Sequence, residues 1–168
     1  MNNSLKMNSM KKKESFIVGK LIRDHSELLK LMEEIVKLAN ALRNSVSKAE
    51  VSNEFFNVLK DAIYLSFKIS SLLAKLDEHM KLEEELIKPY IQDERLKREL
   101  DVLIEGTRRF SEIEREISAT LENYRKGAIA LDDVVKKFVT FVNELQEIVY
   151  QHVSVSDRIL HTTRKHFT

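Results

Sequence analysis

The stretch Leu72-Leu-Ala-Lys-Leu-Asp-Glu-His-Met-Lys-Leu-Glu-Glu-Glu-Leu-Ile-Lys-Pro89 decides the fold class of this 168-residue chain. Its apolar residues recur with the spacing of an amphipathic helix, and the same stripe extends back to Leu59. Pro89 ends the helix, because proline disfavours helical geometry in the residue before it. Two polar residues of this segment, His79 and Glu83, lie on the apolar stripe one turn apart, so both should point into a core.

The same period covers most of the chain. It predicts four helices, over residues 14–44, 48–87, 93–126 and 132–164. Short connections between long helices force antiparallel neighbours, so we expect an all-α fold, an up-down-up-down four-helix bundle. The polar residues 1–13 end in three lysines and should form a disordered tail, which leaves a single domain over 14–168.

Helix boundaries are marked by capping and helix-breaking residues. Ser47-Lys-Ala-Glu50 is typical of a capping box, and Asp132 or Asp133 should cap the last helix. Gly127 should end the third helix as a left-handed cap. Gly106 interrupts that helix at a cost of about 1 kcal/mol relative to alanine.

The composition excludes several classes of function. The absence of cysteine excludes disulfides, thiolate metal sites and cysteine nucleophiles. The chain has 28 basic and 27 acidic residues, and its net charge of +1 gives no support for a nucleic-acid partner. No apolar run approaches the ~18 residues of a membrane span, and no signal peptide is evident. We therefore expect a cytoplasmic protein without nucleic-acid or membrane partners.

Three histidines should fall at one level of the bundle. His25 lies early in the first helix, and His79 and His152 lie late in the second and fourth, so antiparallel packing places them, with Leu100, in one layer. A buried Glu83 beside them costs several kcal/mol unless a cation or hydrogen bonds compensate. Imidazoles with a carboxylate suit iron, zinc or manganese, which favours a metal site over a structural polar cluster.

The two halves of the chain resemble each other around these positions. Residues 23–29 align with 98–104, and residues 79–87 align with 152–160. Leu100 then takes the place of His25, and Ser156 takes the place of Glu83. We infer two helical hairpins, of which the second keeps only His152. His161 and His166 are interpreted as surface residues.

Three segments resemble the hemerythrin-like, or HHE cation-binding, family over residues 14–162. They are Leu21-Ile-Arg-Asp-His-Ser-Glu-Leu-Leu29, His79-Met-Lys-Leu-Glu-Glu-Glu-Leu-Ile-Lys-Pro89 and His152-Val-Ser-Val-Ser-Asp-Arg-Ile-Leu160. The resemblance implies a four-helix bundle around a non-haem di-iron centre. It also implies a role in oxygen binding, in oxygen or nitric-oxide sensing, or in repair of iron–sulfur centres.

The resemblance implies a metal-ligand set of His25, His79, Glu83, His152 and Asp157. His25 and His79 would be terminal ligands, Glu83 a bridging carboxylate and His152 a ligand of the second iron. Asp157 matches the bridging aspartate of oxygen-carrying members. The third helix carries none of the family's histidines, so the second metal position is degenerate. The implied cofactor is one or two iron ions, with another divalent metal or an apo protein as alternatives.

Three functions stay open from the sequence. The first is a metal-binding module that senses or handles oxygen, nitric oxide or iron. The second is a structural or protein-interaction bundle that has lost its metal chemistry, as the missing ligands of the third helix suggest. A metalloenzyme ranks last, because many repair proteins of the family it resembles rely on a cysteine-bearing extra domain, and this chain has no cysteine. No phosphate-binding loop or activated nucleophile is evident, and no catalytic residue is predicted.

Overall fold

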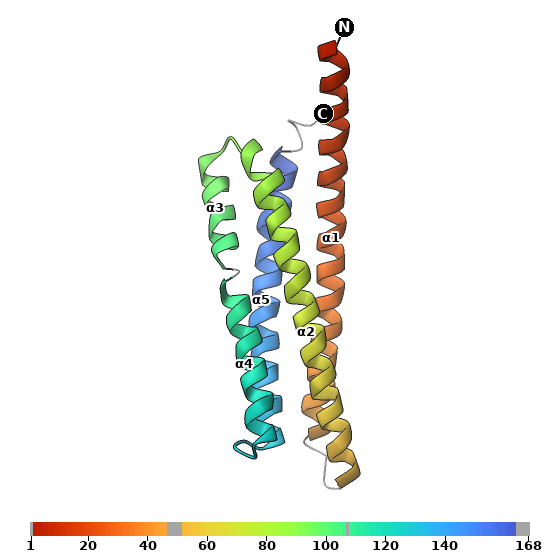
Figure 1. Ribbon diagram of the computed structural model, residues 1–168, viewed down its shortest axis with the longest axis vertical. Helices are drawn as coiled ribbons and strands as arrows, with labels where there is room; N and C mark the ends of the chain where they lie inside the picture. Colours follow the sequence, from red (N-terminus) through yellow and green to blue (C-terminus); the bar gives the residue numbers. More distant parts are fainter. Residues whose placement is uncertain (1, 47–51, 107, 164–168) are drawn as a thin grey trace.

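The computed structural model describes residues 2–46, 52–106 and 108–163, and no residue in these ranges lies in a strand. The elements are α1 (Asn2–Val46), α2 (Ser52–Leu86), the 3-10 helix η1 (Lys88–Tyr90), α3 (Glu94–Glu105), α4 (Arg108–Arg125) and α5 (Leu131–Thr163). α1 and α2 run antiparallel, α3 and α4 follow each other along the third position, and α5 returns beside α1 (Figure 1). The predicted all-α, up-down-up-down bundle is confirmed.

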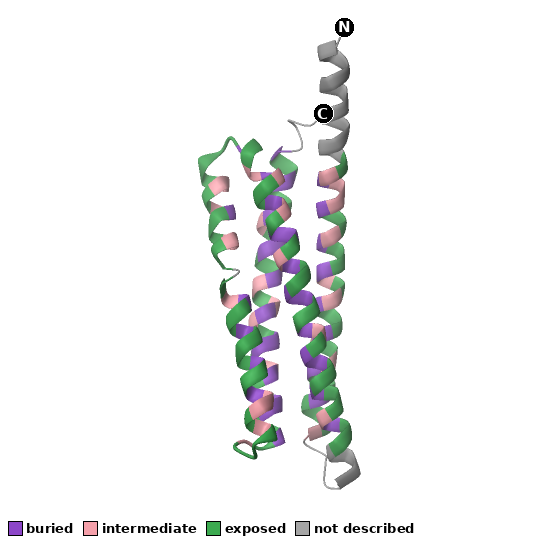
Figure 2. Ribbon diagram, in the orientation of Figure 1, coloured by how far each residue is buried: buried purple, intermediate pink, exposed green. Residues whose placement is uncertain are grey.

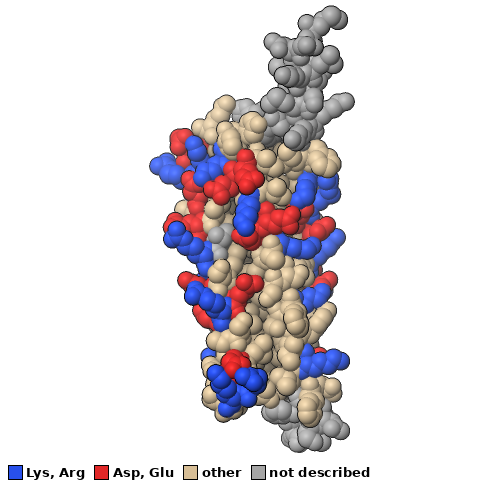
Figure 3. Space-filling view, in the orientation of Figure 1, with Lys and Arg blue, Asp and Glu red and all other residues tan. Residues whose placement is uncertain are grey.

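Buried residues line the helices (Figure 2), and the hydrophobic ones among them form two clusters. The larger one, called here the main core, joins α1, α2, α4 and α5 and includes Met32, Leu72, Ile113 and Phe138. The smaller one, called here the end cluster, consists of Val18, Leu21, Ile87, Ile91, Leu100, Ile159 and Leu160. Charged side chains cover much of the outer surface seen in Figure 3. None of the helices in the described ranges is both long enough and apolar enough to cross a membrane.

Two predicted helix ends are confirmed. α2 ends at Leu86, and Pro89 lies in the following 3-10 turn, where a missing N–H is tolerated. Gly127 adopts a φ of 72° after α4. The Gly127 N–H bonds to the carbonyl of Tyr124 at 2.9 Å, and the Ala128 N–H bonds to that of Asn123 at 2.8 Å. This pair of hydrogen bonds is a Schellman motif, which satisfies carbonyl groups at the helix end.

Other predicted boundaries need correction. The third helix is not continuous, because α3 ends at Glu105 with Gly106 as its C-cap and α4 begins at Arg108. Glycine is among the residues least favourable to a helix interior, and here it ends the helix rather than only weakening it. α5 begins at Leu131, so Asp133 lies in its first turn, where its carboxylate accepts from the Ala130 N–H at 3.4 Å.

The first helix also differs from its prediction. α1 begins at Asn2, whereas the polar composition of residues 1–13 predicts a disordered tail. Residues 2–13 contain neither glycine nor proline, so nothing in the backbone ends the helix between Glu14 and Asn2. The capping box predicted over 47–50 lies outside the described residues.

The left-handed backbone at Gly127 should make alanine costly there. A Cβ at Gly127 would meet no atom within 4 Å, so the cost of Gly127→Ala comes from the backbone conformation alone. We expect the free energy of unfolding to fall by about 1–2 kcal/mol in urea titrations.

Gly19→Ala is the matched control, because Gly19 lies within α1 and its added Cβ would contact only the Arg23 side chain at 3.6 Å. This variant should gain about 0.5–1 kcal/mol. Equal changes in the two variants would contradict the assigned role of Gly127.

Candidate metal centre

Four polar side chains occupy a buried layer between the main core and the end cluster. His25 comes from α1, His79 and Glu83 from successive turns of α2, and His152 from α5. Their exposed fractions are 3%, 2%, 2% and 1%, respectively. These four residues lie on the same helix faces that bury leucine and isoleucine elsewhere, so they point inward at one level. The predicted convergence of the four residues is therefore confirmed.

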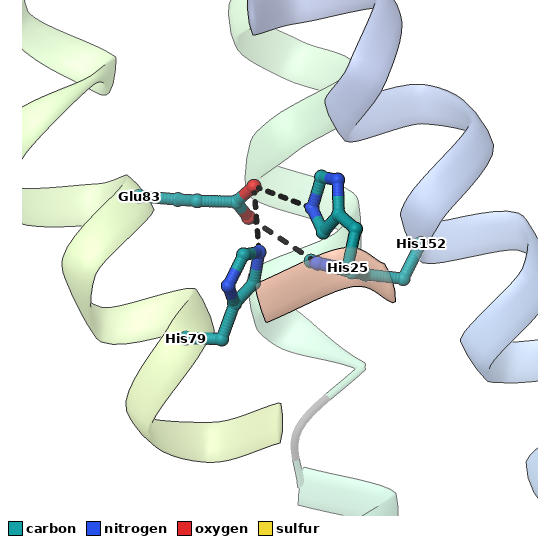
Figure 4. Close-up of side chains that lie close together, drawn as sticks. All are labelled: His25, His79, Glu83 and His152. Carbon is teal, nitrogen blue, oxygen red and sulfur yellow. Dashed lines mark hydrogen bonds and ion pairs between the residues drawn. The ribbon is translucent and has the colours of Figure 1, made fainter. Parts of the chain in front are cut away.

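The carboxylate of Glu83 is the point toward which the three imidazoles converge (Figure 4). Its Oε1 lies 3.2 Å from Nε2 of His79 and 3.7 Å from Nε2 of His25. Its Oε2 lies 3.4 Å from Nε2 of His152. One ligand atom from each of the four residues lies within 4.8 Å of the others. The layer thus gathers nitrogen and oxygen ligands in a volume suited to one ion.

Further polar groups contact this layer from α1 and α5. Asp157 Oδ1 lies 2.7 Å from Nδ1 of His25, so the carboxylate accepts the Nδ1 proton, and Nε2 is the ring nitrogen that lies toward Glu83. The Ser156 hydroxyl donates to Oε1 of Glu83. Asp24 Oδ2 lies 3.7 Å from Nδ1 of His79.

The electrostatics of the layer favour an ionised Glu83. Burial opposes that ionisation, but the adjacent imidazoles of His25 and His79 outweigh it and hold the pKa of Glu83 well below its ordinary value. Burial also opposes a charge on His25, yet the carboxylates of Glu83 and Asp157 raise its pKa above 6.5. Burial lowers the pKa of His152 to about 4, so this imidazole is neutral near pH 7.

Several buried atoms of the layer have no hydrogen-bond partner among the described residues. They are Nε2 of His25, Nδ1 of His79, Oε2 of Glu83 and both ring nitrogens of His152. Buried polar atoms are normally paired, because each unpaired one costs free energy. A divalent cation at the centre would accept lone pairs from the Nε2 atoms and from Glu83. The donor set therefore fits a metal ion.

The structure separates the remaining predicted positions from this layer. Asp157 is 54% exposed and contacts His25 rather than the central group. Leu100 is buried in the end cluster, and Ile104, one turn further along α3, packs against both clusters. His161 is exposed, as expected, while His166 lies outside the described residues. Ser156 also belongs to the site but is absent from the predicted ligand set, although its position one turn after His152 indicates that it faces the layer.

The lowered pKa of His152 predicts how the stability of the metal-free protein depends on pH. The unfolded chain binds this proton more readily than the folded one, so stability falls as pH drops from about 6.5 toward about 4. Between pH 6.5 and 5 this loss should be about 2 kcal/mol. His25 acts with the opposite sign at higher pH, because its raised pKa stabilises the fold below 6.5 and that contribution fades as pH rises through the folded pKa.

Urea unfolding at several pH values measures this slope. His152→Gln should make it shallower between pH 6.5 and 5, whereas His161→Gln, at an exposed position, should leave it unchanged. Identical slopes in both variants and the wild type would contradict the assignment to His152.

Comparison with known families agrees with this geometry. The family model described as hemerythrin HHE cation binding domain matches residues 17–163, which include all four residues of the buried layer. Neither a curated protein nor a solved structure matches the chain. The match spans most of the sequence and nearly the whole described bundle. The chain therefore belongs to the hemerythrin HHE cation-binding domain family.

Proposed function

We propose that this protein holds a single non-haem iron ion with His25, His79, Glu83 and His152, and uses it to sense or handle oxygen, nitric oxide or iron. The observation that supports this most directly is the convergence of three Nε2 atoms and a carboxylate in a buried layer whose polar atoms lack partners. Imidazole nitrogens with a carboxylate oxygen suit iron, and also zinc or manganese. Bound iron would supply redox chemistry toward a diatomic ligand.

The residues of the layer have distinct roles in this proposal. Glu83 supplies the negative charge that offsets the cation in a buried site. Asp157 holds the proton on Nδ1 of His25, which keeps Nε2 available as a ligand. Ser156 donates to one oxygen of Glu83 and leaves the other free of hydrogen bonds, facing His152. Asp157 then acts as a positioning residue, rather than as the bridging ligand that the resemblance implies.

A second ion has too few ligands in this proposal. Among the described residues, α3 and α4 add no histidine or carboxylate to the buried group. The same observation favours the second candidate function, a structural bundle that has lost its metal chemistry. Metal content separates the two, because a purely structural layer binds no ion tightly.

Metal analysis of protein purified anaerobically from iron-rich cells tests the proposal. We expect about one iron per chain, with loss of binding when Glu83 is replaced by alanine. The metal-free Glu83→Ala variant should remain folded, because the change also removes the cost of burying a carboxylate.

Glu84→Ala is the control for this experiment, since Glu84 is the next residue of α2 but is exposed, 3.8 Å from Lys88. It should bind iron like the wild type. Wild-type protein without metal would support the structural bundle, and undiminished binding by Glu83→Ala would exclude Glu83 as a ligand.

Asp157→Asn tests the positioning of His25. An amide cannot hold the Nδ1 proton as strongly as a carboxylate, so iron affinity should fall about 10- to 100-fold in competition with a chelator. Asp77→Asn, which removes a surface carboxylate 2.6 Å from Lys81, should leave the affinity unchanged. Equal affinities in the two variants would contradict the role of Asp157.

A further inference from the structure

A separate pocket of about 170 Å³ lies between α1 and α2, and one of the four central residues forms part of its wall. The lining residues are Lys20, Asp24, Glu27, Leu28, Lys75, Glu78 and His79. His79 thus belongs both to this pocket, called here the access pocket, and to the buried layer. The access pocket connects the surface of the bundle with the edge of the candidate metal centre.

The imidazole of His79 separates the access pocket from the centre. Its Nε2 lies 3.2 Å from Glu83, on the inner side, whereas its Nδ1 lies 3.7 Å from Asp24, which lines the pocket. This Nδ1 has no hydrogen-bond partner, although the side chain is only 2% exposed. An unpaired ring nitrogen directed at a carboxylate-lined pocket is a potential ligand for a cation.

The charges of the access pocket also favour a cation. Three carboxylates line it, and two ammonium groups offset them only in part. Lys20 lies 3.1 Å from Asp24, and Lys75 lies 3.3 Å from Glu27. Glu78 makes no ion pair or hydrogen bond within the described part of the chain. The lining of the pocket therefore carries one excess negative charge.

The larger pocket between α3 and α5, of about 450 Å³, has a positively charged lining. Arg95, Arg98 and Arg158 line it with Glu99 as the single carboxylate. A divalent cation would be repelled there, and α3 adds no ligand beyond it. The α1–α2 side is thus the better approach to the buried layer.

We propose that the access pocket is the route by which a divalent cation reaches the centre. This inference rests on the proposed metal function. Glu78 and Glu27 attract the ion, and Asp24 receives it beside Nδ1 of His79. The ion then passes the His79 imidazole to reach Glu83 and the Nε2 atoms of the buried layer.

Loading kinetics test this route with Co²⁺, whose visible absorption changes when nitrogen ligands bind it. The second-order association rate constant is measured by stopped flow on metal-free protein at about 0.1 M salt, where charges act over about 10 Å. Glu78→Lys reverses one charge at the pocket and should slow association about three- to tenfold. Lys75→Met makes the pocket more negative and should accelerate it.

Glu114→Lys is the matched control, because it makes the same charge reversal at an exposed position of α4. It should load at the wild-type rate. Raising the salt to about 1 M should make the association rate constants of the four proteins similar, since charges are then screened beyond about 3 Å.

Two outcomes would overturn these proposals. If Glu78→Lys and Glu114→Lys load equally fast at about 0.1 M salt, the route is wrong while the metal site stands. If the wild type binds no Co²⁺ at any concentration, the proposed metal function itself fails.

Discussion

A carboxylate buried among three imidazoles is the constraint on which the packing of this bundle depends. Helices packed only through apolar stripes can slide along one another, because one leucine contact can replace another. The Glu83 carboxylate cannot tolerate such sliding, since its partners come from α1 and α5 as well as from its own helix. A slide of one turn, about 5.4 Å, would leave the charge buried without His25 or His152. The polar layer therefore fixes the register of three helices.

The third position of the bundle contributes mainly apolar packing to the interior. It is formed by two helices separated at Gly106, and its buried residues are apolar apart from Thr120. Ile104 packs against both hydrophobic clusters and so lies across the level of the polar layer. Among the described residues, this side adds no ligand to the layer. The low polarity there strengthens the interactions of Glu83 with the imidazoles, because charges in a medium of low dielectric constant are poorly screened.

Much of this arrangement could be predicted from the sequence, for identifiable reasons. His25, His79, Glu83 and His152 each occupy an apolar stripe, and helical periodicity alone places such residues inward. The separation of α3 from α4 could not be predicted, because a single glycine can either weaken a helix or end it. The contacts of Ser156 and Asp24 could not be predicted either, since the partners of short side chains at the edge of a stripe depend on how the helices pack. The family resemblance predicts Asp157 at the site, but its contact with His25 depends on the rotation of α5 about its axis.

The polar layer also divides the hydrophobic interior into two parts of unequal size. The end cluster contains seven buried residues, and the main core extends over the rest of the bundle. The buried residues of the two clusters form separate groups, joined by the partly buried Ile104. Such a division allows the two parts to open at different free energies. Amide hydrogens beside the end cluster should then exchange through a local opening that leaves the main core folded. A ligand bridging α1, α2 and α5 at the boundary would join the two units into one.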